Sequence, residues 1–253
     1  MIPITPSNPE RLALIGYNSL LTSSTEAPKA LIPNTFERYT PASGAVVAKF
    51  QLSTSATVNY IAIGAHNIGS HDDGTVVTIS YATTIGGALT SIDSVTPSDN
   101  SALFFSFDSI TMAEIAITTN ATTSGLEIGV VYAGESLQMQ QPIYGGVDPI
   151  DLASVTKYQS AMSDSGQFLG RNVIRQGLES TLKWQHLDDL WIRNTFKPFM
   201  QSAKTLPFFI KWRPDYYDSA VFGYTTSDIK PANMGGGSRL MTVSVDMRGH
   251  ADI

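Results

Sequence analysis

Two histidines and two aspartates gather in one short stretch of the sequence, at His66, His71, Asp72 and Asp73. Imidazole and carboxylate groups both bind divalent cations, so this stretch is a candidate metal site. The spacing matches no strong metal motif, and no third histidine is near. The alternative is that His66 and Asn67 fix a loop through side-chain hydrogen bonds to the backbone. We favour this structural role and expect no functional metal and no cofactor.

Other motifs that carry catalysis are missing or out of place. The glycine run Gly235–Gly237 follows no strand of a strand–helix–strand unit and precedes no helix, so it cannot cradle a phosphate. The sequence contains no Gly-x-Ser-x-Gly elbow and no His-Glu-x-x-His helix. Carboxylates are plentiful enough for a glycosidase pair, but Trp184, Trp191 and Trp212 fall in apolar patterns typical of a core. We therefore expect no enzymatic activity and rank glycan hydrolysis last.

The C-terminal half concentrates large apolar rings and two arginines. Arg171 and Arg175 flank an apolar pair and could form a small cationic patch. We interpret them instead as ion-pairing residues on a strand at a subunit interface, where arginine is favoured. A small domain rarely buries every ring that it carries, and apolar surface left over usually marks a contact site. The candidate interface residues are therefore Arg171, Arg175, Trp191, Phe196, Phe199, Phe208, Phe209 and Trp212.

The elements that must position these residues are mostly strands. Residues 1–44 are rich in proline and indicate an N-terminal arm with short strands, and residues 45–135 have the pattern of a β-sandwich of the jelly-roll kind. Apolar or β-branched alternation recurs there between loops of Gly, Ser, Asp and Asn. The expected strands are 45–53, Val58–Ile63, Thr75–Tyr81, Leu103–Phe107, Ala113–Thr118 and Leu126–Val131.

A linker is expected at residues 136–150, which are rich in Gln, Gly and Pro. The charge balance changes at the same place. Residues 1–140 carry 4 Lys and Arg against 11 Asp and Glu, whereas residues 141–253 carry 12 against 11. This change indicates two domains with different surroundings.

Residues 151–253 are expected to form a second β-rich domain with one or two short helices. Strands at Ser154–Met162 and Val173–Lys183 flank a glycine-containing turn. Asp188–Ser202 is the expected helix, with acidic residues at its start and a kink or split at Pro198. The predicted fold class is therefore mainly β.

The composition limits the classes of function. A chain of 253 residues with 42% hydrophobic and 15% charged residues can bury a real core. The absence of cysteine excludes disulfides, thiolate metal sites and a cysteine nucleophile. The first residues lack the pattern of a signal peptide, and no stretch approaches the roughly 18 apolar residues of a membrane span. Neither half is basic enough to indicate nucleic-acid binding.

Two sets of segments carry a family resemblance. Val58–Gly69 followed by Thr75–Tyr81 resembles a part of the discoidin-like, galactose-binding-type β-sandwiches found in bacteriophage tail proteins. Gly166–Arg175, Phe196–Phe199 and Pro207–Pro214 occur in an order similar to that of structural tail proteins of tailed phages, some of them similar to distal tail components.

This resemblance implies a non-enzymatic virion component in the tail, tail tip or baseplate, synthesised in the host cytoplasm. We expect residues 151–253 to assemble into a homo-oligomer, as a ring of three or six, beside other phage tail proteins. Residues 45–132 alone are expected to stay monomeric. The alternative is a carbohydrate-binding module that contacts host surface glycans. Exposed aromatic side chains on the loops of residues 45–132 would favour that alternative, and the sequence offers few.

Overall fold

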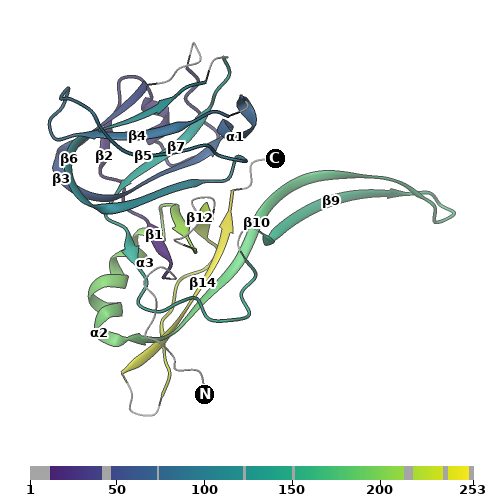
Figure 1. The fold of residues 1–253 in the computed structure, drawn as a ribbon. Coiled ribbons are helices and arrows are strands. Elements are labelled where there is room, and N and C mark those ends of the chain that lie inside the picture. Colours follow the sequence, from purple (N-terminus) through teal and green to yellow (C-terminus); the bar gives the residue numbers. More distant parts are fainter. Residues whose placement is uncertain are drawn as a thin grey trace, which may run out of the picture.

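The computed structural model describes residues 12–41, 47–72, 74–121, 124–149, 152–213, 219–235 and 239–250. Over these residues the chain forms two antiparallel sheets and little helix, which confirms the prediction of a mainly β fold. Figure 1 shows a β-sandwich packed on a second β domain, from which one long hairpin projects away from both.

The sandwich is built from one sheet of order β2-β3-β6-β4-β5, with β7 paired to β3. Each strand pairs with its neighbours in the antiparallel sense. The elements are β2 (Leu21–Ser23), the 3-10 turn Pro28–Leu31, β3 (Val47–His66), α1 (Ile68–His71), β4 (Val77–Ala82), β5 (Thr90–Val95), β6 (Leu103–Thr119) and β7 (Ile128–Gly134).

Two long strands supply both layers of this sandwich. The β3–β6 register shifts between Gln51 and Ala56 and again between Val58 and Tyr60, which marks bulges where the strands bend. Residues 53–57 of β3 and 106–111 of β6 are mostly exposed, as expected at the corner where a sheet folds over. The apolar side chains on either side of that corner face inward and form the sandwich core.

The second sheet has the order β8-β1-β11-β12-β14-β10-β9, with β13 paired to β14. β10 is long enough to serve two partners, because its distal half pairs with β9 and its proximal half with β14. The strands are β1 (Leu14–Gly16), β8 (Leu137–Gln138), β9 (Ser154–Met162), β10 (Phe168–Asp188), β11 (Phe208–Lys211), β12 (Ala220–Thr225), β13 (Ala232–Asn233) and β14 (Leu240–Gly249).

The helical segment runs from α2 (Asp189–Trp191) through a π-turn (Ile192–Phe196) to α3 (Lys197–Ser202). Asp188 caps its start, because its carboxylate accepts the backbone N–H of Trp191 at 3.0 Å. Pro198 lies in the first turn of α3. Proline removes a hydrogen-bond donor and crowds the preceding turn, which is why the widened π-turn stands before it. The helical segment is continuous from Asp189 to Ser202, so the expected kink or split at Pro198 takes the form of a local π-turn and the helix is not divided.

The sandwich and the second sheet are held together by an aromatic cluster, here called the interdomain cluster. Tyr60, Phe104 and Tyr132 of the sandwich pack against Phe209 and Phe222 of the second sheet, all buried. Tyr60 stacks on Phe104 at 5.2 Å between centroids, and Phe209 lies 4.7 Å from Phe222. The sandwich is therefore fixed to the second sheet by packing.

Segments from the expected N-terminal arm and linker also take part in the second sheet. β1 pairs with both β8 and β11, and β8 itself lies within the expected linker 136–150. The predicted division into independently folding units at 45–135 and 151–253 stays a prediction. The described contacts place strands from outside 151–253 at the edge of that domain's sheet.

Candidate functional site

The long hairpin, residues 154–178, extends from the second sheet, and in the described part of the chain only its last residue, Leu178, pairs with a further strand, at Gly249 of β14. β9 ends the sheet, and the distal half of β10 pairs only with β9 in the described part of the chain. The two strands are joined by a tight turn in which the Ser163 N–H donates to the Gln167 carbonyl at 2.9 Å. Gly166 has a φ of +80°, which explains the glycine in this turn. The sequence predicted this turn and its flanking strands.

One face of the long hairpin is apolar and uncovered, and is here called the apolar face. The register pairs Met162 with Phe168 and Tyr158 with Val173, and cross-strand partners share a face. Met162 and Phe168 are each 66% exposed, and Val173 is 56% exposed. Side chains of this size are normally covered, and an exposed apolar strip on a monomer marks an interaction site.

The opposite face of the long hairpin is polar. It pairs Lys157 with Arg175 and Gln159 with Asn172. The register shifts between Phe168 and Gly170 and again between Val173 and Arg175, so one residue bulges out at each place. The bulges keep the apolar side chains on one face although they are not regularly spaced in the sequence. The hairpin is therefore amphipathic across its thickness.

Arg171 lies on the apolar face and is held against it. Its guanidinium carbon stands 4.1 Å from the centroid of the Tyr158 ring, and its Nε donates to the Ser160 hydroxyl at 3.2 Å. The cation–π contact holds the Arg171 guanidinium over the Tyr158 ring while both side chains stay exposed. Tyr158 and Arg171 together form an exposed pair of an aromatic and an arginine side chain, and both residue types are enriched at protein interfaces.

The structure separates the residues expected at an interface into two groups. Arg171 and Arg175 lie on the long hairpin, exposed. The other group is aromatic: four of its rings are fully buried and the two tryptophans are half-buried. Its members are Phe196, Phe199, Phe208, Phe209, Trp191 and Trp212.

The four phenylalanines are covered by their own chain. Phe199 packs edge-on against Phe196 at 5.3 Å and against Phe208 at 5.1 Å, in the core under the helix. Phe209 belongs to the interdomain cluster. The uncovered apolar surface of the domain instead includes Tyr158, Met162, Phe168 and Val173 of the long hairpin, none of which was a candidate interface residue in the sequence.

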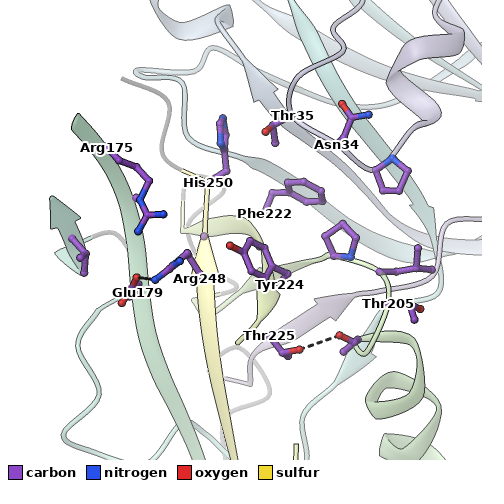
Figure 2. A pocket seen from close by; sticks show the side chains of 18 of the residues that line it. Asn34, Thr35, Arg175, Glu179, Thr205, Phe222, Tyr224, Thr225, Arg248 and His250 are labelled. Carbon is purple, nitrogen blue, oxygen red and sulfur yellow. Dashed lines mark hydrogen bonds and ion pairs between the residues drawn. The ribbon is translucent and has the colours of Figure 1, made fainter. Parts of the chain in front are cut away.

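A cleft of about 560 Å³ opens at the root of the long hairpin, between it, the 203–207 loop and the segment 33–35 of the sandwich. Figure 2 shows Arg175 on β10 and Arg248 with Tyr224 on the neighbouring strands around this cleft. Arg248 pairs with Glu179. The hydrogen bonds to Glu179 and Tyr224 raise the pKa of the Arg248 guanidinium.

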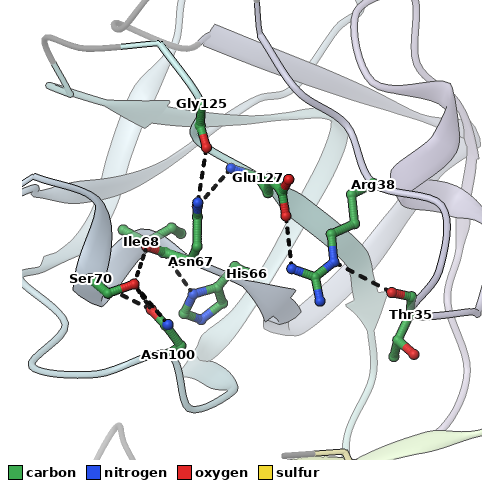
Figure 3. Close-up of polar contacts among 9 residues, drawn as sticks. All are labelled: Thr35, Arg38, His66, Asn67, Ile68, Ser70, Asn100, Gly125 and Glu127. Atoms are coloured by element: carbon green, nitrogen blue, oxygen red, sulfur yellow. Dashed lines mark hydrogen bonds and ion pairs between the residues drawn. The ribbon is translucent and has the colours of Figure 1, made fainter. Parts of the chain in front are cut away.

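The loop that carries the histidines is fixed by hydrogen bonds, as predicted (Figure 3). The Asn67 amide donates to the Gly125 carbonyl at 2.9 Å, and its oxygen accepts the Glu127 N–H at 2.7 Å. The buried His66 accepts the Ile68 N–H through Nδ1 at 3.3 Å. This network joins α1 to the segment that leads into β7.

Within the described residues, no group of three or more His, Asp or Glu side chains gathers as a metal ion would require. His71 lies 3.9 Å from the Asp72 carboxylate. Asp73 lies outside the described residues. No helix in the described part of the chain is long and apolar enough to cross a membrane.

One aromatic side chain stands out on the sandwich. Phe36 is 93% exposed, on a turn held by Asn34, whose side-chain oxygen accepts the N–H groups of Phe36 and Glu37 at 3.1 and 2.8 Å. Two residues on, Arg38 pairs with Glu127 at 2.8 Å (Figure 3). Over the described residues of 47–132, the exposed large apolar side chains are Ile85 and Leu89, and neither is aromatic.

Comparison with known proteins gives structural matches alone. No family model matches the chain, and no curated protein matches it. Chitosan-binding module 1 of a Paenibacillus sp. IK-5 chitosanase/glucanase is similar at 15% identity and a TM-score of 0.39, over 47% of this chain and 98% of that chain. A pectin-binding carbohydrate-binding module gives 14% identity and a TM-score of 0.39, over 47% and 93% of the two chains.

The CBM32 module of AlyQ, in complex with 4,5-unsaturated mannuronic acid, gives 19% identity and a TM-score of 0.36, over 49% of this chain and 98% of that chain. These names describe carbohydrate-binding modules, and none of the three names a virion component. The matches extend over about half of the chain, and at these TM-scores they transfer neither ligand nor activity to it.

Proposed function

We propose that this chain is a structural subunit that assembles with copies of itself through the long hairpin, as a component of the tail or tail tip of a tailed-phage virion. The observation that carries the assembly proposal is the uncovered apolar face. The virion setting rests on the sequence resemblance to phage tail proteins.

An isolated two-stranded hairpin is at best marginally stable in water, and a strip of exposed apolar side chains adds no stability to a monomer. Tyr158, Met162 and Phe168 gain free energy only when another surface covers them, at about 25 cal/mol per Å² of apolar area buried. A free hairpin edge is also a template for pairing with another chain. A second subunit supplies both kinds of cover.

Charge favours a second copy as that surface. Residues 154–178 hold Lys157, Arg171 and Arg175 against Asp164, a net charge of +2. Because the whole chain carries −6, the remainder carries −8. A cationic hairpin on an acidic body is attracted to the body of another copy, and contacts between unlike surfaces of identical subunits close into rings when the rotation permits.

Sedimentation of the full chain tests the proposal. Phe168→Ser with Val173→Ser removes apolar side chains from the apolar face, and the apparent association constant should fall about 100-fold or more. The matched control is Gln159→Ser with Asn172→Ser on the polar face of the same hairpin, which should assemble as the wild type does. An equal loss of assembly in both variants, or assembly that neither variant changes, would contradict a role of the apolar face in self-association.

Glycan binding is the second candidate, and Phe36 is the observation that favours it. A rigidly presented, exposed ring can stack on the C–H face of a sugar, and the nearby Arg38–Glu127 pair supplies polar groups beside it. Titration with host surface polysaccharide should show binding that Phe36→Ala abolishes and that Ile85→Ala, an exposed apolar control on the same domain, leaves intact. Equal polysaccharide binding by the two variants would show that Phe36 is not part of the glycan-binding site.

A further inference from the structure

The tip of the long hairpin combines one acidic group with exposed apolar side chains. Asp164 is the only acidic residue in 154–178 and stands in the turn itself. Met162 and Phe168 flank the turn as a cross-strand pair, and Leu169 follows at a bulge, all exposed. The tip therefore presents a carboxylate flanked by these three apolar side chains, here called the apolar shoulders.

The cleft at the root of the long hairpin has the opposite character. Its cationic lining includes Arg175 and Lys204, neither of which forms an ion pair in the described structure, and Arg248, which is already paired with Glu179. Leu206 and Tyr224 line the same cleft and are exposed. In a chain with a net charge of −6, two cations that form no ion pair among the described residues therefore lie beside exposed apolar side chains.

A hairpin tip cannot reach the cleft of its own chain. Val155 lines the cleft and Met162 stands at the other end of β9, seven residues further along. At about 3.4 Å per residue these positions are ~24 Å apart. A tip that occupies this cleft must come from another copy, and the contact then repeats from tip to root around an assembly.

We propose that the cleft receives the tip of the long hairpin of a second copy, with Asp164 against Arg175 and Lys204 and the apolar shoulders against Leu206 and Tyr224. The inference rests on the proposed self-assembly and names the surface that accepts the hairpin. It joins a carboxylate to two cations that form no ion pair in the described structure, and it covers apolar side chains on both sides. Neighbouring subunits are then spaced by roughly the length of the hairpin.

Cysteine pairs test the contact directly, because the chain contains no cysteine of its own. The full chain with Ser165→Cys in the tip and Thr205→Cys at the cleft should form intermolecular disulfides under mild oxidation, since a disulfide needs Cα atoms within about 7 Å. The resulting ladder of covalent oligomers should collapse on reduction. Ser165→Cys with Ser91→Cys, an exposed position on β5 of the sandwich, is the matched control and should give no ladder.

Charge exchange is the second arm of the test. Asp164→Lys or Lys204→Glu alone should weaken assembly about tenfold, and the two changes together should restore it. Assembly that persists unchanged in both single variants, with equal linking by the two cysteine pairs, overturns the tip-in-cleft contact and leaves self-assembly standing. Monomeric wild-type chain at every concentration overturns the proposed function together with the inference.

Discussion

The interdomain cluster and the apolar face of the long hairpin contain similar side chains in opposite circumstances. Phe209 and Tyr60 are buried, and the Tyr60 hydroxyl donates to the Asn18 carbonyl at 2.8 Å. Phe168 and Tyr158 are exposed, and the Arg171 guanidinium lies over the Tyr158 ring. In the interdomain cluster, the aromatic side chains are covered by residues of the same chain, so their packing stabilises the monomer. On the apolar face, the side chains are not covered by residues of the same chain.

The two regions should therefore respond differently to the same kind of substitution. Truncation in the interdomain cluster removes contacts that already exist and lowers the stability of the monomer. Truncation on the apolar face removes contacts that form only between chains, so it lowers association and leaves monomer stability nearly unchanged. Four predictions follow this contrast, from the largest effect on the free energy of unfolding to the smallest.

Phe209→Ala should lower the free energy of unfolding by roughly 3–5 kcal/mol, since it empties the centre of the interdomain cluster. Denaturant melts monitored by tryptophan fluorescence give this value. The control is Phe36→Ala, a ring that is 93% exposed, which should change it by less than about 0.5 kcal/mol. Equal effects in the two variants would contradict the packing described for Phe209.

Gly16→Ala should cost roughly 1–3 kcal/mol, because a Cβ at Gly16 would overlap the buried Tyr60 ring where β1 passes the sandwich. Thermal unfolding followed by circular dichroism measures the loss. Gly145→Ala is the matched control, because nothing lies within 4 Å of a Cβ placed there. A neutral Gly16→Ala would mean that β1 is not tightly held against Tyr60.

Alkaline pH should weaken the interdomain cluster. Burial raises the pKa of Tyr132 to about 12 and raises that of Tyr60 well above its usual value of 10.0. The folded state therefore keeps its protons longer than the unfolded state does. The stabilisation is fully present below pH 10 and is lost as pH rises toward the folded-state pKa, by roughly 1.4 kcal/mol at pH 11 for Tyr132 alone.

Unfolding titrations between pH 8 and pH 11 measure this slope. Tyr132→Phe should reduce the slope, because the substituted ring cannot ionise, and the part that comes from Tyr60 should remain. A pH-independent stability of the wild-type chain over this range would contradict the burial of the two hydroxyl groups.

Val173→Ser should change the free energy of unfolding of the monomer by less than about 0.5 kcal/mol, although Val173 is a large apolar residue on a strand. The reason is that the side chain is 56% exposed and touches no core. Chemical denaturation at a dilution where the protein is monomeric provides the measurement. A loss as large as that of Phe209→Ala would show that the hairpin is covered within one chain.

Local patterns predicted most strands, but they divided β3 and β6 into two strands each. Residues 53–57 and 108–111 are largely polar and mostly exposed, so they resemble loops in the sequence although they belong to the long strands β3 and β6. β5 (Thr90–Val95) was not predicted, because it is largely exposed and carries a weak apolar pattern. The apolar pattern of a sequence indicates which side chains are buried. At the corners and edges of a sheet, residues pair as strands although their side chains are exposed, so the pattern misses them.

The candidate site was harder to predict for two physical reasons. The sequence directed attention to the largest rings, such as Phe196 and Phe208, and large rings also fill a small domain's core first. The apolar face became visible only with the register, since bulges near Leu169 and Ile174 interrupt its spacing along β10. The cleft joins the segments 33–35, 203–207 and 248–250, which no local pattern connects.

The native mass of the unmodified full chain over a series of concentrations tests the central claim most directly. One chain has a mass of 27.3 kDa. Assembly through the apolar face predicts a closed species at a fixed multiple of that mass, with three or six copies as the expected number, which dissociates on dilution. A single species at 27.3 kDa at every concentration would contradict the account.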